Sequence, residues 1–400
     1  MKRIYLDHNA TTPLNSEVAD EGCRCLREDF GNPQTLYSYG KDARKLVHDS
    51  REMVASLIGA KREEIIFTSG GTESDNMAVR GIAYGNVNKG RHIISSSIEH
   101  HAVLESCRAL EKDGFEVTYL PVDENGVVRL DELQKAIRPD TVLISIMHAN
   151  NETGTIQPIS EIGGIAREKG VLFHTDTVQT FGKVRINVDE MNIDLLSASA
   201  HKLHGPKGIG ALYIRKGVRL KNLIFGGHQE RKMRPGTHNV PGIVGLGKAA
   251  EIAARDMEGE GNKVLRLRER LWGGIKAGIP HIRLNGHPTQ RLSNTLNVSF
   301  EFVEGESLIL SLDDQGICVA SGSACTSDSL EPSHVLTAMG LSPEVAHGSL
   351  RFSLGRDNTE EEIDYVIETL PKVVERMRSM SPLYREFLKR QKEINVGAGR

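Results

Sequence analysis

The chain has 400 residues, 38% of them hydrophobic, and a formal net charge of −3. A protein of this size and composition folds around a large core with room for two lobes, and its near-neutral charge gives no reason to expect binding to nucleic acid or to an anionic membrane. Its first acidic residue, Asp7, follows only three apolar residues, and no apolar run approaches the ~18 residues of a membrane span. We therefore predict a cytoplasmic protein with no secretory signal and no membrane segment.

The first two thirds of the chain alternate between strand and helix patterns. After a polar, extended stretch (1–13), apolar residues at helical spacing predict an amphipathic helix over 43–58, and a second helix is expected over 74–84. Short apolar runs bounded by polar residues or glycine predict strands at 65–68, 93–97, 117–122, 142–147, 171–174, 194–198 and 209–214. This alternation is typical of an α/β protein with a mostly parallel sheet covered by helices on both faces.

Beyond Pro241 the pattern changes. A long charged helix is expected over 246–275, and a helix near the C-terminus should begin with a capping box formed by Thr359 and Glu362. Between them, alternating apolar residues predict a half-buried antiparallel strand: Leu296, Val298, Phe300 and Phe302. The basic tail from Ser381 is expected to fray, as chain ends do by default, with docking to a partner as the alternative.

The cysteines do not indicate a structural framework. There are five of them, scattered through a long chain: Cys23, Cys25, Cys107, Cys318 and Cys325. An odd, dispersed set argues against disulfides. The Cys23-x-Cys25 spacing does not suit a zinc knuckle, so we predict no resident metal site.

Lys202 stands at the junction of two predicted strands. It follows the run 194–198, and the glycine-rich segment 205–210 forces a turn just after it. Open α/β sheets bind ligands at such strand ends, and a lysine desolvated there can lose its proton and form an imine with a carbonyl group. We therefore predict that Lys202 holds pyridoxal phosphate (PLP) as a Schiff base. Lys207 is the alternative, but its place inside the turn favours a solvated role.

Two further strand ends carry groups that suit this cofactor. The segment 68–74 joins a strand to a helix through Gly70 and Gly71, so free N–H groups at the helix start could bind the phosphate. It lacks the lysine of a nucleotide-binding loop, and a plain helix cap is the alternative. Asp176, at the end of a later strand, could keep the pyridine nitrogen protonated, with Gln179 near the ring hydroxyl, although an N-cap aspartate fits equally well.

The polar residues at two other strand ends are less specific. His100 or His101 could stack on a flat cofactor ring and shuttle protons, whereas a metal site is disfavoured because no third ligand is evident. The segment 150–154 could supply an amide to the site, or it could simply form a turn.

Cys325 and Arg351 are the remaining candidates. Cys325 lies in a loop of small polar residues, 321–330, where an exposed thiol is a candidate nucleophile, while Cys318 has apolar neighbours and is expected to be a buried small hydrophobe. Arg351 alternates with apolar residues on a predicted strand, where its guanidinium could bind a carboxylate or form a structural salt bridge.

The order of the motifs is more specific than any one of them. The segments that matter are 5–12, 30–33, 68–76, 99–100, 150–154, 174–179, 199–202, 226–231 and 321–330. Through them the chain closely resembles, over nearly its whole length, the NifS/IscS-type cysteine desulfurases, of the class V aminotransferase group of fold type I PLP enzymes. The long cysteine loop, followed by 331–336, is similar to the NifS/IscS branch rather than the SufS-like branch.

The resemblance implies a fold type I transferase with two domains. The larger, 14–257, would hold PLP on a mostly parallel seven-stranded sheet, and a smaller α+β domain, formed by 1–13 and 258–400, would carry the cysteine loop. It also implies a homodimer in which Thr237 reaches the phosphate of the other subunit's site. The implied partners are L-cysteine and an iron–sulfur scaffold or another sulfur carrier.

The resemblance also implies roles for single residues. Lys202, His100 and Cys325 are the implied catalytic residues, and Cys325 could in addition ligate an iron–sulfur cluster transiently. Arg351, helped by Asn151, is implied to bind the substrate carboxylate. The implied PLP ligands are Gly71, Thr72, His100, Asn151, Asp176, Gln179, Ser199, His201, Lys202 and Thr237.

The implied reaction converts L-cysteine to L-alanine and leaves the sulfur as a persulfide on Cys325. A selenocysteine lyase or another class V PLP enzyme is the nearest alternative, and an iron–sulfur scaffold protein is the alternative without catalysis. Three positions depart from the family pattern: Tyr37, Thr177 and His238, where histidine, alanine and glutamate are frequent. None of them removes a group that the chemistry needs.

Overall fold

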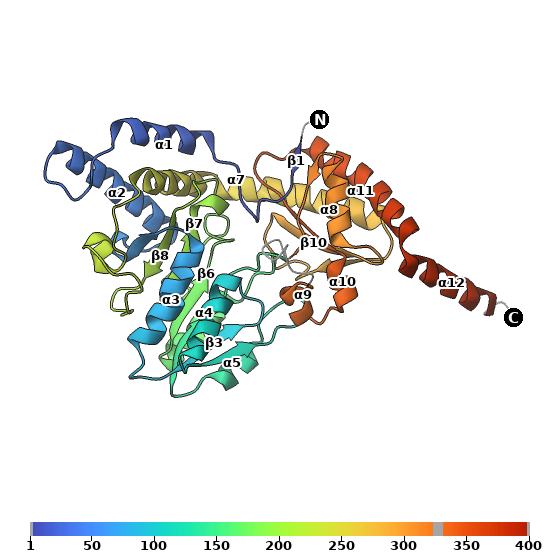
Figure 1. Cartoon of the computed structure of the whole chain (residues 1–400), viewed down its shortest axis with the longest axis horizontal. Coiled ribbons are helices and arrows are strands. Elements are labelled where there is room, and N and C mark those ends of the chain that lie inside the picture. Colours follow the sequence, from blue (N-terminus) through green and yellow to red (C-terminus); the bar gives the residue numbers. More distant parts are fainter. Residues whose placement is uncertain (1–2, 323–330, 398–400) are drawn as a thin grey trace.

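The computed structural model describes residues 3–322 and 331–397, with side chains described as far as residue 391. Two lobes lie side by side, and one long helix, α7 (Val240–Gly278), runs through both of them (Figure 1). No helix in these two ranges combines the length and the apolar character that crossing a membrane requires.

The larger lobe is built on a seven-stranded sheet with the order β2-β8-β7-β6-β5-β3-β4. Its strands are β2 (Ile65–Thr68), β3 (His92–Ser96), β4 (Glu116–Leu120), β5 (Thr141–Ser145), β6 (Leu172–Asp176), β7 (Leu195–Ser199) and β8 (Gly210–Ile214). β8 is antiparallel to both of its neighbours, and the other strand pairs are parallel. The predicted α/β class and the mostly parallel sheet are therefore confirmed.

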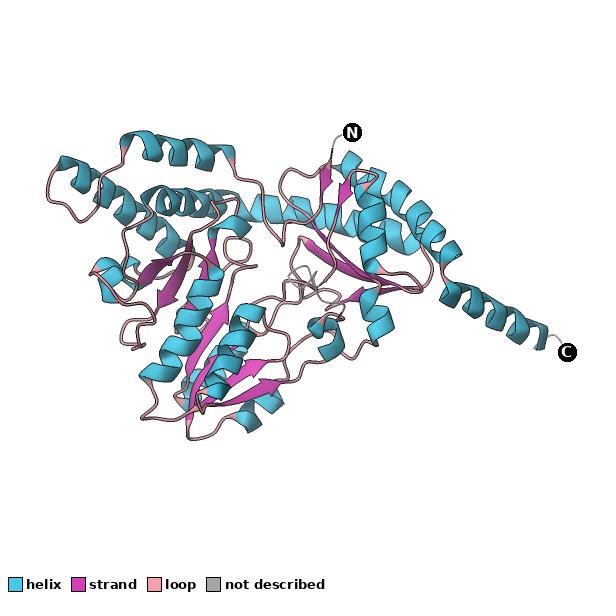
Figure 2. Ribbon diagram, viewed as in Figure 1, coloured by secondary structure: helices cyan, strands magenta, loops and turns pink. Residues whose placement is uncertain are grey.

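Helices cover both faces of this sheet (Figure 2). They are α1 (Ser16–Glu28), α2 (Ser38–Leu57), α3 (Gly71–Gly85), α4 (His101–Lys112), α5 (Leu130–Ala136) and α6 (Ile159–Lys169). Successive strand residues point to opposite faces: Phe67 packs in the core under α1, α2 and α7, and Ile66 in the core under α3 and α4. Burial on both faces explains why the strands are continuous apolar runs.

The smaller lobe has a three-stranded antiparallel sheet in which β10 (Thr295–Phe300) lies between β9 (Ile282–Asn285) and β12 (Ser349–Ser353). Its helices are α8 (Gly305–Asp313), α9 (His334–Ala338), α10 (Pro343–His347), α11 (Glu360–Met380) and α12 (Pro382–Gly397). The predicted capping box of Thr359 and Glu362 starts α11.

The N-terminus belongs to the smaller lobe. β1 (Ile4–Tyr5) pairs in parallel with β11 (Ile317–Cys318), and Ile4 and Leu6 share the core that contains the second half of α7. The first half of α7 packs in the core of the larger lobe. The residue at which the chain divides into two domains stays a prediction.

The prediction of a half-buried strand at 296–302 was wrong. All six residues of β10 are buried, because the face opposite the apolar one is covered by a polar network that joins Asn285, Asn297 and Ser299. Phe302 lies beyond the strand in a left-handed conformation (φ 69°).

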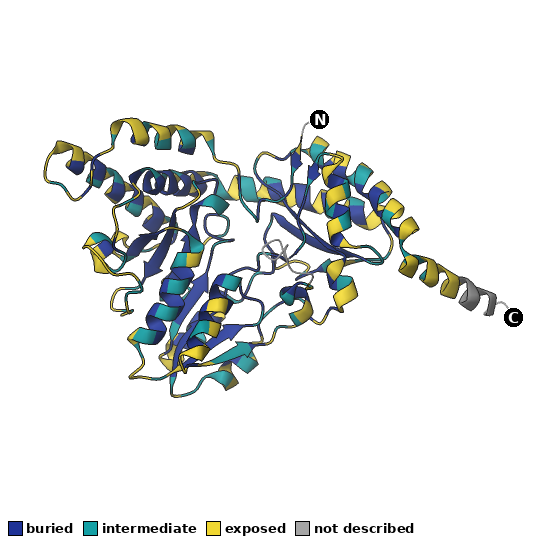
Figure 3. Cartoon of the chain, in the orientation of Figure 1, coloured by how far each residue is buried: buried dark blue, intermediate teal, exposed yellow. Residues whose placement is uncertain are grey.

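The expectation that the tail from Ser381 frays by default was wrong, because the chain continues as α12. The ring of Phe387 on α12 stacks 4.7 Å from that of Phe302, and Tyr384 also contacts Phe302. As far as residue 391, most of the other residues of α12 are exposed, and the helix projects from the body of the molecule (Figure 3).

Candidate active site

Lys202 lies where the sequence placed it, at the end of β7. The strand passes into a single 3₁₀ turn (Ala200–Lys202), and the Lys202 amine donates hydrogen bonds to the backbone carbonyls of Asn9 and Ala10, the latter at 2.7 Å. Lys207, the alternative, is exposed in the following turn. Of the two lysines, Lys202 is the one held by directed contacts in the interior.

Asn9 contacts Lys202, and the sequence alone did not point to it. Its carbonyl accepts hydrogen bonds from both Lys202 and the Gln179 side chain, the latter at 3.0 Å. The side-chain amide nitrogen of Asn9 (Nδ2) donates to the backbone carbonyl of Asn151 and to the hydroxyl of Thr295. Asn9 therefore joins the residues around Lys202 to the smaller lobe. The available signal was its position in the motif 5–12.

Asp176 is the last residue of β6 and is buried. One carboxylate oxygen accepts the backbone N–H of Val178 at 2.8 Å. Burial raises the pKa of Asp176 to about 6, against the opposing effects of the Val178 hydrogen bond and the Lys202 charge. Burial also raises the pKa of Asp75 well above its usual range, with the nearby Asp176 adding to the rise. Asp176 is therefore mainly ionised at neutral pH.

His100 caps α4, and its Nδ1 accepts the backbone N–H of Ala102 at 3.1 Å. Burial lowers the pKa of His100 to about 4, and the charge of Lys202 lowers it further. The imidazole is thus neutral at neutral pH and close enough to Lys202 to sense its charge. The ring of His101 instead packs against that of His334, with 5.0 Å between the ring centroids.

The start of α3 and the end of β7 form one corner. The helix begins at Gly71 without a side-chain cap, and a side chain built on Gly70 or Gly71 would come within 3.8 Å of Ser199. On Gly71 it would also lie 2.6 Å from a methyl group of Val178. The absence of side chains here leaves the first N–H groups of α3 open to an anion.

Three other residues were predicted to bind the phosphate at this corner: His201, Thr72 and Thr237. His201 contacts the Thr11 hydroxyl at 3.2 Å, and burial lowers its pKa to about 4. Thr72 is exposed on the first turn of α3, and Thr237 is exposed on a separate loop. The structure of the single chain thus brings Gly71 and Ser199 together and leaves the phosphate role of Thr237 untested.

Arg351 lies on β12 and is 2% exposed. Its guanidinium donates to the carbonyl of Asn151 at 3.1 Å and forms an ion pair with Asp7 at 2.8 Å. Its Nε has no hydrogen-bond partner in the part of the chain that the structure describes. The structural ion pair considered from the sequence is therefore present, and the binding of a substrate carboxylate by Arg351 stays a prediction.

The segment 150–154 forms the turn that was one of the two alternatives expected for it, and its supply of an amide to the site stays a prediction. The Asn150 side chain accepts the N–H groups of Glu152 and Thr153 and so builds the turn itself. Asn151 is the residue that faces Arg351, through its carbonyl.

These residues fit PLP. The Oε1 atom of Gln179 is buried without a hydrogen-bond partner in the described chain, and the Nε2 atom of the same side chain shares the Asn9 carbonyl with the amine of Lys202. An ionised carboxylate, Asp176, and the uncapped start of α3 at Gly71 supply the two other groups that a phosphorylated pyridine requires.

Comparison with known proteins agrees with this geometry. The model of the family "Aminotransferase class-V" matches residues 4–366. The chain belongs to the aminotransferase class-V family. Among its relatives, the cysteine desulfurase IscS of Methanosarcina thermophila is 58% identical over 382 residues, which are 96% of this chain and 94% of the relative. A cysteine desulfurase IscS of Clostridium botulinum is 54% identical over 394 residues, 98% of this chain and 99% of the relative.

Solved structures of similar proteins share the fold. A NifS-like protein superposes with a TM-score of 0.88 at 41% identity and covers 93% of this chain and 99% of its own. SspA, solved in complex with cysteine, superposes with a TM-score of 0.78 at 39% identity and covers 89% of this chain and 99% of its own.

The cysteine expected to take sulfur in this class-V protein, Cys325, lies outside the described residues. Cys318, predicted to be buried, is half-buried instead: it sits at the edge of the small β1–β11 pair, with its thiol 3.8 Å from a carboxylate oxygen of Asp313. Partial burial, with Asp313 adding to it, raises the pKa of Cys318.

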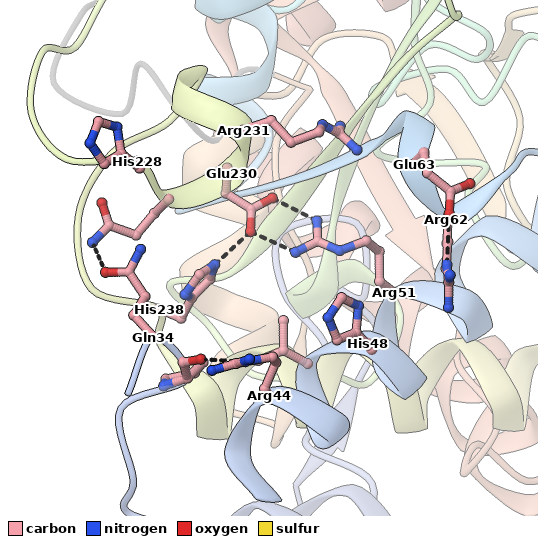
Figure 4. Close-up of a pocket in the computed structure, with 13 residues that line it drawn as sticks. Gln34, Arg44, His48, Arg51, Arg62, Glu63, His228, Glu230, Arg231 and His238 are labelled. Atoms are coloured by element: carbon pink, nitrogen blue, oxygen red, sulfur yellow. Dashed lines mark hydrogen bonds and ion pairs between the residues drawn. The ribbon is translucent and has the colours of Figure 1, made fainter. Parts of the chain in front are cut away.

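His238, one of the departures from the NifS/IscS-type pattern, lines a hollow of about 340 Å³ whose lining does not include Lys202. Figure 4 shows this hollow. In it, Glu230 forms two 2.6 Å hydrogen bonds with Arg51 and one of 2.8 Å with His238, and it accepts the N–H of Phe67. A histidine is compatible here because it donates to a carboxylate supplied by Glu230.

Proposed function

We propose that this chain is a cysteine desulfurase that uses PLP to convert L-cysteine to L-alanine and retains the sulfur as a persulfide on Cys325. The observation that carries the proposal is the convergence at Asn9. Its carbonyl accepts from Lys202 and Gln179, and its amide shares the Asn151 carbonyl with Arg351. An amine for the cofactor and a guanidinium for the substrate carboxylate thereby meet at one place.

The residues that would hold PLP are those with matching chemistry. Gly71, Ser199, Thr72 and His201 would bind its phosphate, Asp176 its ring nitrogen, and Gln179 with Asn151 its ring hydroxyl region, while His100 would stack on the ring. When bound, PLP supplies an electron sink for the carbon that bears the substrate amine.

The chain's own residues would handle the proton. Lys202, when released from the cofactor, is the base for the Cα proton of the substrate. Arg351 fixes the substrate by its carboxylate, which would compete with Asp7 for the guanidinium. Asp176 remains ionised at neutral pH and so can stabilise a protonated ring nitrogen.

The sulfur step joins the sulfur of Cys325 to that of the substrate, and it relies on the electron sink that PLP would supply when bound. The thiolate of Cys325 attacks the sulfur of the substrate, a sulfur–sulfur bond forms, and the carbon–sulfur bond breaks. The carbon retains the bonding electrons and takes up a proton, which yields alanine. The persulfide then passes to an acceptor, which we propose to be an iron–sulfur scaffold or another sulfur carrier.

We also propose that the working unit is a homodimer with Thr237 completing the phosphate site of the other subunit. Thr237 is exposed on its loop, and a Gln229–Gln34 hydrogen bond of 2.8 Å ties this loop to the α1–α2 connection. Large apolar side chains are exposed on these two segments: Phe30, Leu36, Tyr37, Tyr39, Ile224 and Phe225. Exposed apolar groups gathered in this way are typical of a subunit interface.

The decisive test compares Cys325→Ala with Cys318→Ala. The Cys325→Ala variant should bind PLP and show the absorbance change of the bound cofactor when L-cysteine is added, but release almost no alanine and carry no additional sulfur by mass spectrometry. The Cys318→Ala variant should stay active. Alanine release by Cys325→Ala at the wild-type rate would overturn the proposal, since sulfide would then leave directly.

A further inference from the structure

Arg351, the guanidinium proposed for the substrate carboxylate, already contacts a carboxylate of the chain itself. Its Nη2 atom donates to Oδ1 of Asp7 at 2.8 Å, and the Arg351 side chain is buried while that of Asp7 is half-buried. In the ranges that the structure describes, this is the one ion pair that Arg351 forms. A ligand carboxylate that binds Arg351 therefore meets a group that is already engaged.

The other two nitrogens of the Arg351 guanidinium show which positions Asp7 takes. Nη1 donates to the carbonyl of Asn151 at 3.1 Å, and Nε is buried with no hydrogen-bond partner among the described residues. Nε and Nη2 lie on the same edge of a guanidinium, an edge that can bind one carboxylate through two parallel hydrogen bonds. Asp7 therefore occupies one of the two positions on this edge.

The carboxylate of Asp7 is not what holds its own segment in place. The backbone carbonyl of Asp7 accepts the hydroxyl of Tyr5 at 3.0 Å and the N–H of Ala10 at 3.0 Å. For the Asp7 side chain, the hydrogen bond to Arg351 is the one that the structure records within the described ranges. The side chain thus acts on Arg351 rather than on the fold of the N-terminal segment.

A counter-charge beside Arg351 has a physical reason. An unpaired guanidinium buried at this place would destabilise the free protein, because nothing would offset the loss of its hydration. Glu152 also senses the charge of Arg351, but burial raises the pKa of Glu152 to about 7, so that it is only partly ionised at neutral pH. Asp7, in direct contact, is therefore the main counter-charge among the described residues.

A ligand carboxylate on Arg351 would bring a second negative charge to the same guanidinium. Two carboxylates on one guanidinium lie within roughly 4–6 Å of each other, where like charges weaken each other's binding. A ligand that offers only a carboxylate has no second attachment to offset this repulsion. A ligand that also offers an amine to the cofactor does have one.

We propose that Asp7 is a specificity-determining residue: it occupies Arg351 in the free site, competes there with the carboxylate of a ligand, and so restricts the site to carboxylates that also carry an amine. The class selected is that of free α-amino acids, and the class excluded is that of amine-free carboxylates. This inference rests on the proposed function and deepens it, because it adds the exclusion of wrong ligands to the attraction by Arg351. Asp7 acts through Arg351 and is not assigned contact with the substrate.

The test measures binding to the holoenzyme without turnover, with three ligands that carry no sulfur. L-alanine has an amine and a carboxylate, ethylamine has only the amine, and propionate has only the carboxylate. The dissociation constants of the two amines come from the absorbance change of the bound cofactor, and that of propionate comes from its competition with L-alanine.

The variant is Asp7→Asn, which keeps the shape of the side chain and removes its charge. Asp364→Asn is the matched control, because Asp364 on α11 also forms an ion pair with an arginine, Arg270, at 2.6 Å, and both side chains of that pair are exposed. The control removes the same charge from an ion pair that contacts neither Arg351 nor Asp7.

In Asp7→Asn we expect the dissociation constants of L-alanine and propionate to fall by about tenfold, between the effects of like charges about 4 Å apart in bulk water and near a protein surface. The dissociation constant of ethylamine should stay at the wild-type value, because this ligand has no carboxylate. The melting temperature of Asp7→Asn should be lower than that of wild type, and propionate should raise it more than it raises that of wild type. Asp364→Asn should bind all three ligands as wild type does.

Unchanged or weaker binding of L-alanine by Asp7→Asn overturns the inference, because Asp7 would then only orient Arg351. Equal tightening of L-alanine and ethylamine overturns it as well, because the effect would not depend on the carboxylate. A double-mutant cycle isolates the contact: in an Arg351→Met background, Asp7→Asn should no longer tighten the binding of L-alanine. A tenfold gain that persists in this background would contradict competition at Arg351.

If Asp7→Asn does not fold, the wild type alone decides. A crystal structure of the holoenzyme with L-alanine should show the ligand carboxylate on Nε and Nη2 of Arg351, with Asp7 displaced beyond hydrogen-bonding distance of Nη2. An Asp7–Arg351 contact that is retained at 2.8 Å beside bound L-alanine overturns the inference.

Failure of the inference is distinguishable from failure of the proposed function. If wild-type enzyme forms neither alanine nor a persulfide from L-cysteine, the function is wrong. If wild type forms both, and Asp7→Asn binds L-alanine and ethylamine as wild type does, only the role of Asp7 is wrong.

Discussion

The amine of Lys202 donates hydrogen bonds to two backbone carbonyl oxygens. The amine of Lys202 is directed at Asn9 and Ala10, where it also affects the pKa of His100 and Asp176. A lysine in such surroundings is pre-positioned for a covalent bond, because little of its side-chain freedom remains to be lost.

We expect Lys202→Ala to lose both turnover and the covalent attachment of PLP. Borohydride should fix the cofactor to wild type and to Lys207→Ala but not to Lys202→Ala, with peptide mass spectrometry locating the modified lysine. A cofactor that remains fixed in Lys202→Ala would show that the assignment is wrong.

The side chains of the site were easier to predict than the backbone around them. Lys202, Asp176, Gln179 and Arg351 carry groups with specific chemistry, and each lies where a predicted strand ends or runs. The contacts of Asn9 with Lys202 and Gln179 could not be predicted from the sequence, because they are made by its backbone carbonyl, a group that every residue has. Only the folded chain shows which carbonyl faces the lysine.

Among the elements, the loop around Glu230 is held by charge rather than by regular structure. Glu230, Arg231 and Lys232 all have positive φ angles (43°, 54° and 70°), a conformation that is unfavourable for residues with side chains. The ion pair of Glu230 with Arg51, and its bonds to His238 and Phe67, offset this strain.

We expect Glu230→Gln to destabilise the protein at neutral pH by about 3 kcal/mol, the energy of a pKa lowered from its usual value to about 2 by these hydrogen bonds despite burial. Because the folded-state pKa is the lower one, this stability is present above the usual carboxyl pKa of about 4.3 and is lost as the pH falls toward 2.

The melting temperatures of Glu230→Gln and wild type should therefore converge between about pH 4.5 and pH 2. Glu63→Gln alters an exposed glutamate that lines the same hollow and is the matched control. A constant difference across this pH range would contradict the assigned pKa.

Elements with a strong pattern were predicted in place: β2 has its expected bounds, whereas α7, expected over 246–275, extends further at both ends, from Val240 to Gly278. The errors came from tertiary contacts. The polar residues of β10 are buried because neighbouring strands and Asn9 satisfy them, which no local pattern reveals. The tail was expected to fray because its few apolar residues gave no sign that Phe302 would receive them.

Phe387 helps to attach α12 to the smaller lobe, through its ring contacts with Phe302 and His281. We expect Phe387→Ala to raise trypsin cleavage within α12 by roughly fivefold, as an aromatic contact worth about 1 kcal/mol is lost. Alanine release should not change. Leu388→Ala, at the exposed neighbouring position, should leave cleavage at the wild-type rate; equal cleavage of both variants would contradict the role of Phe387.

For the molecule as a whole, a shared phosphate site makes a prediction about mixed dimers. In a heterodimer of Lys202→Ala and Thr237→Val subunits, one site carries both changes and the other carries neither. Each homodimer should be impaired, and the heterodimer should regain up to half of the wild-type alanine release. An inactive heterodimer, or a monomer with full PLP occupancy at sub-micromolar concentration, would contradict the shared site.

The contact between Asn9 near the N-terminus and Ser353 of β12 has a consequence for biosynthesis. The N–H of Asn9 donates to the hydroxyl of Ser353, 344 residues later in the sequence. A ribosome adds roughly 5–20 residues per second, so the N-terminal segment waits roughly 20 to 70 s after it emerges before this partner exists. The larger lobe can fold during that interval, but the amine of Lys202 cannot be seated in its final surroundings until the last part of the chain is made. A prematurely terminated chain that ends before β12 therefore lacks a complete cofactor site, however well its large sheet has formed.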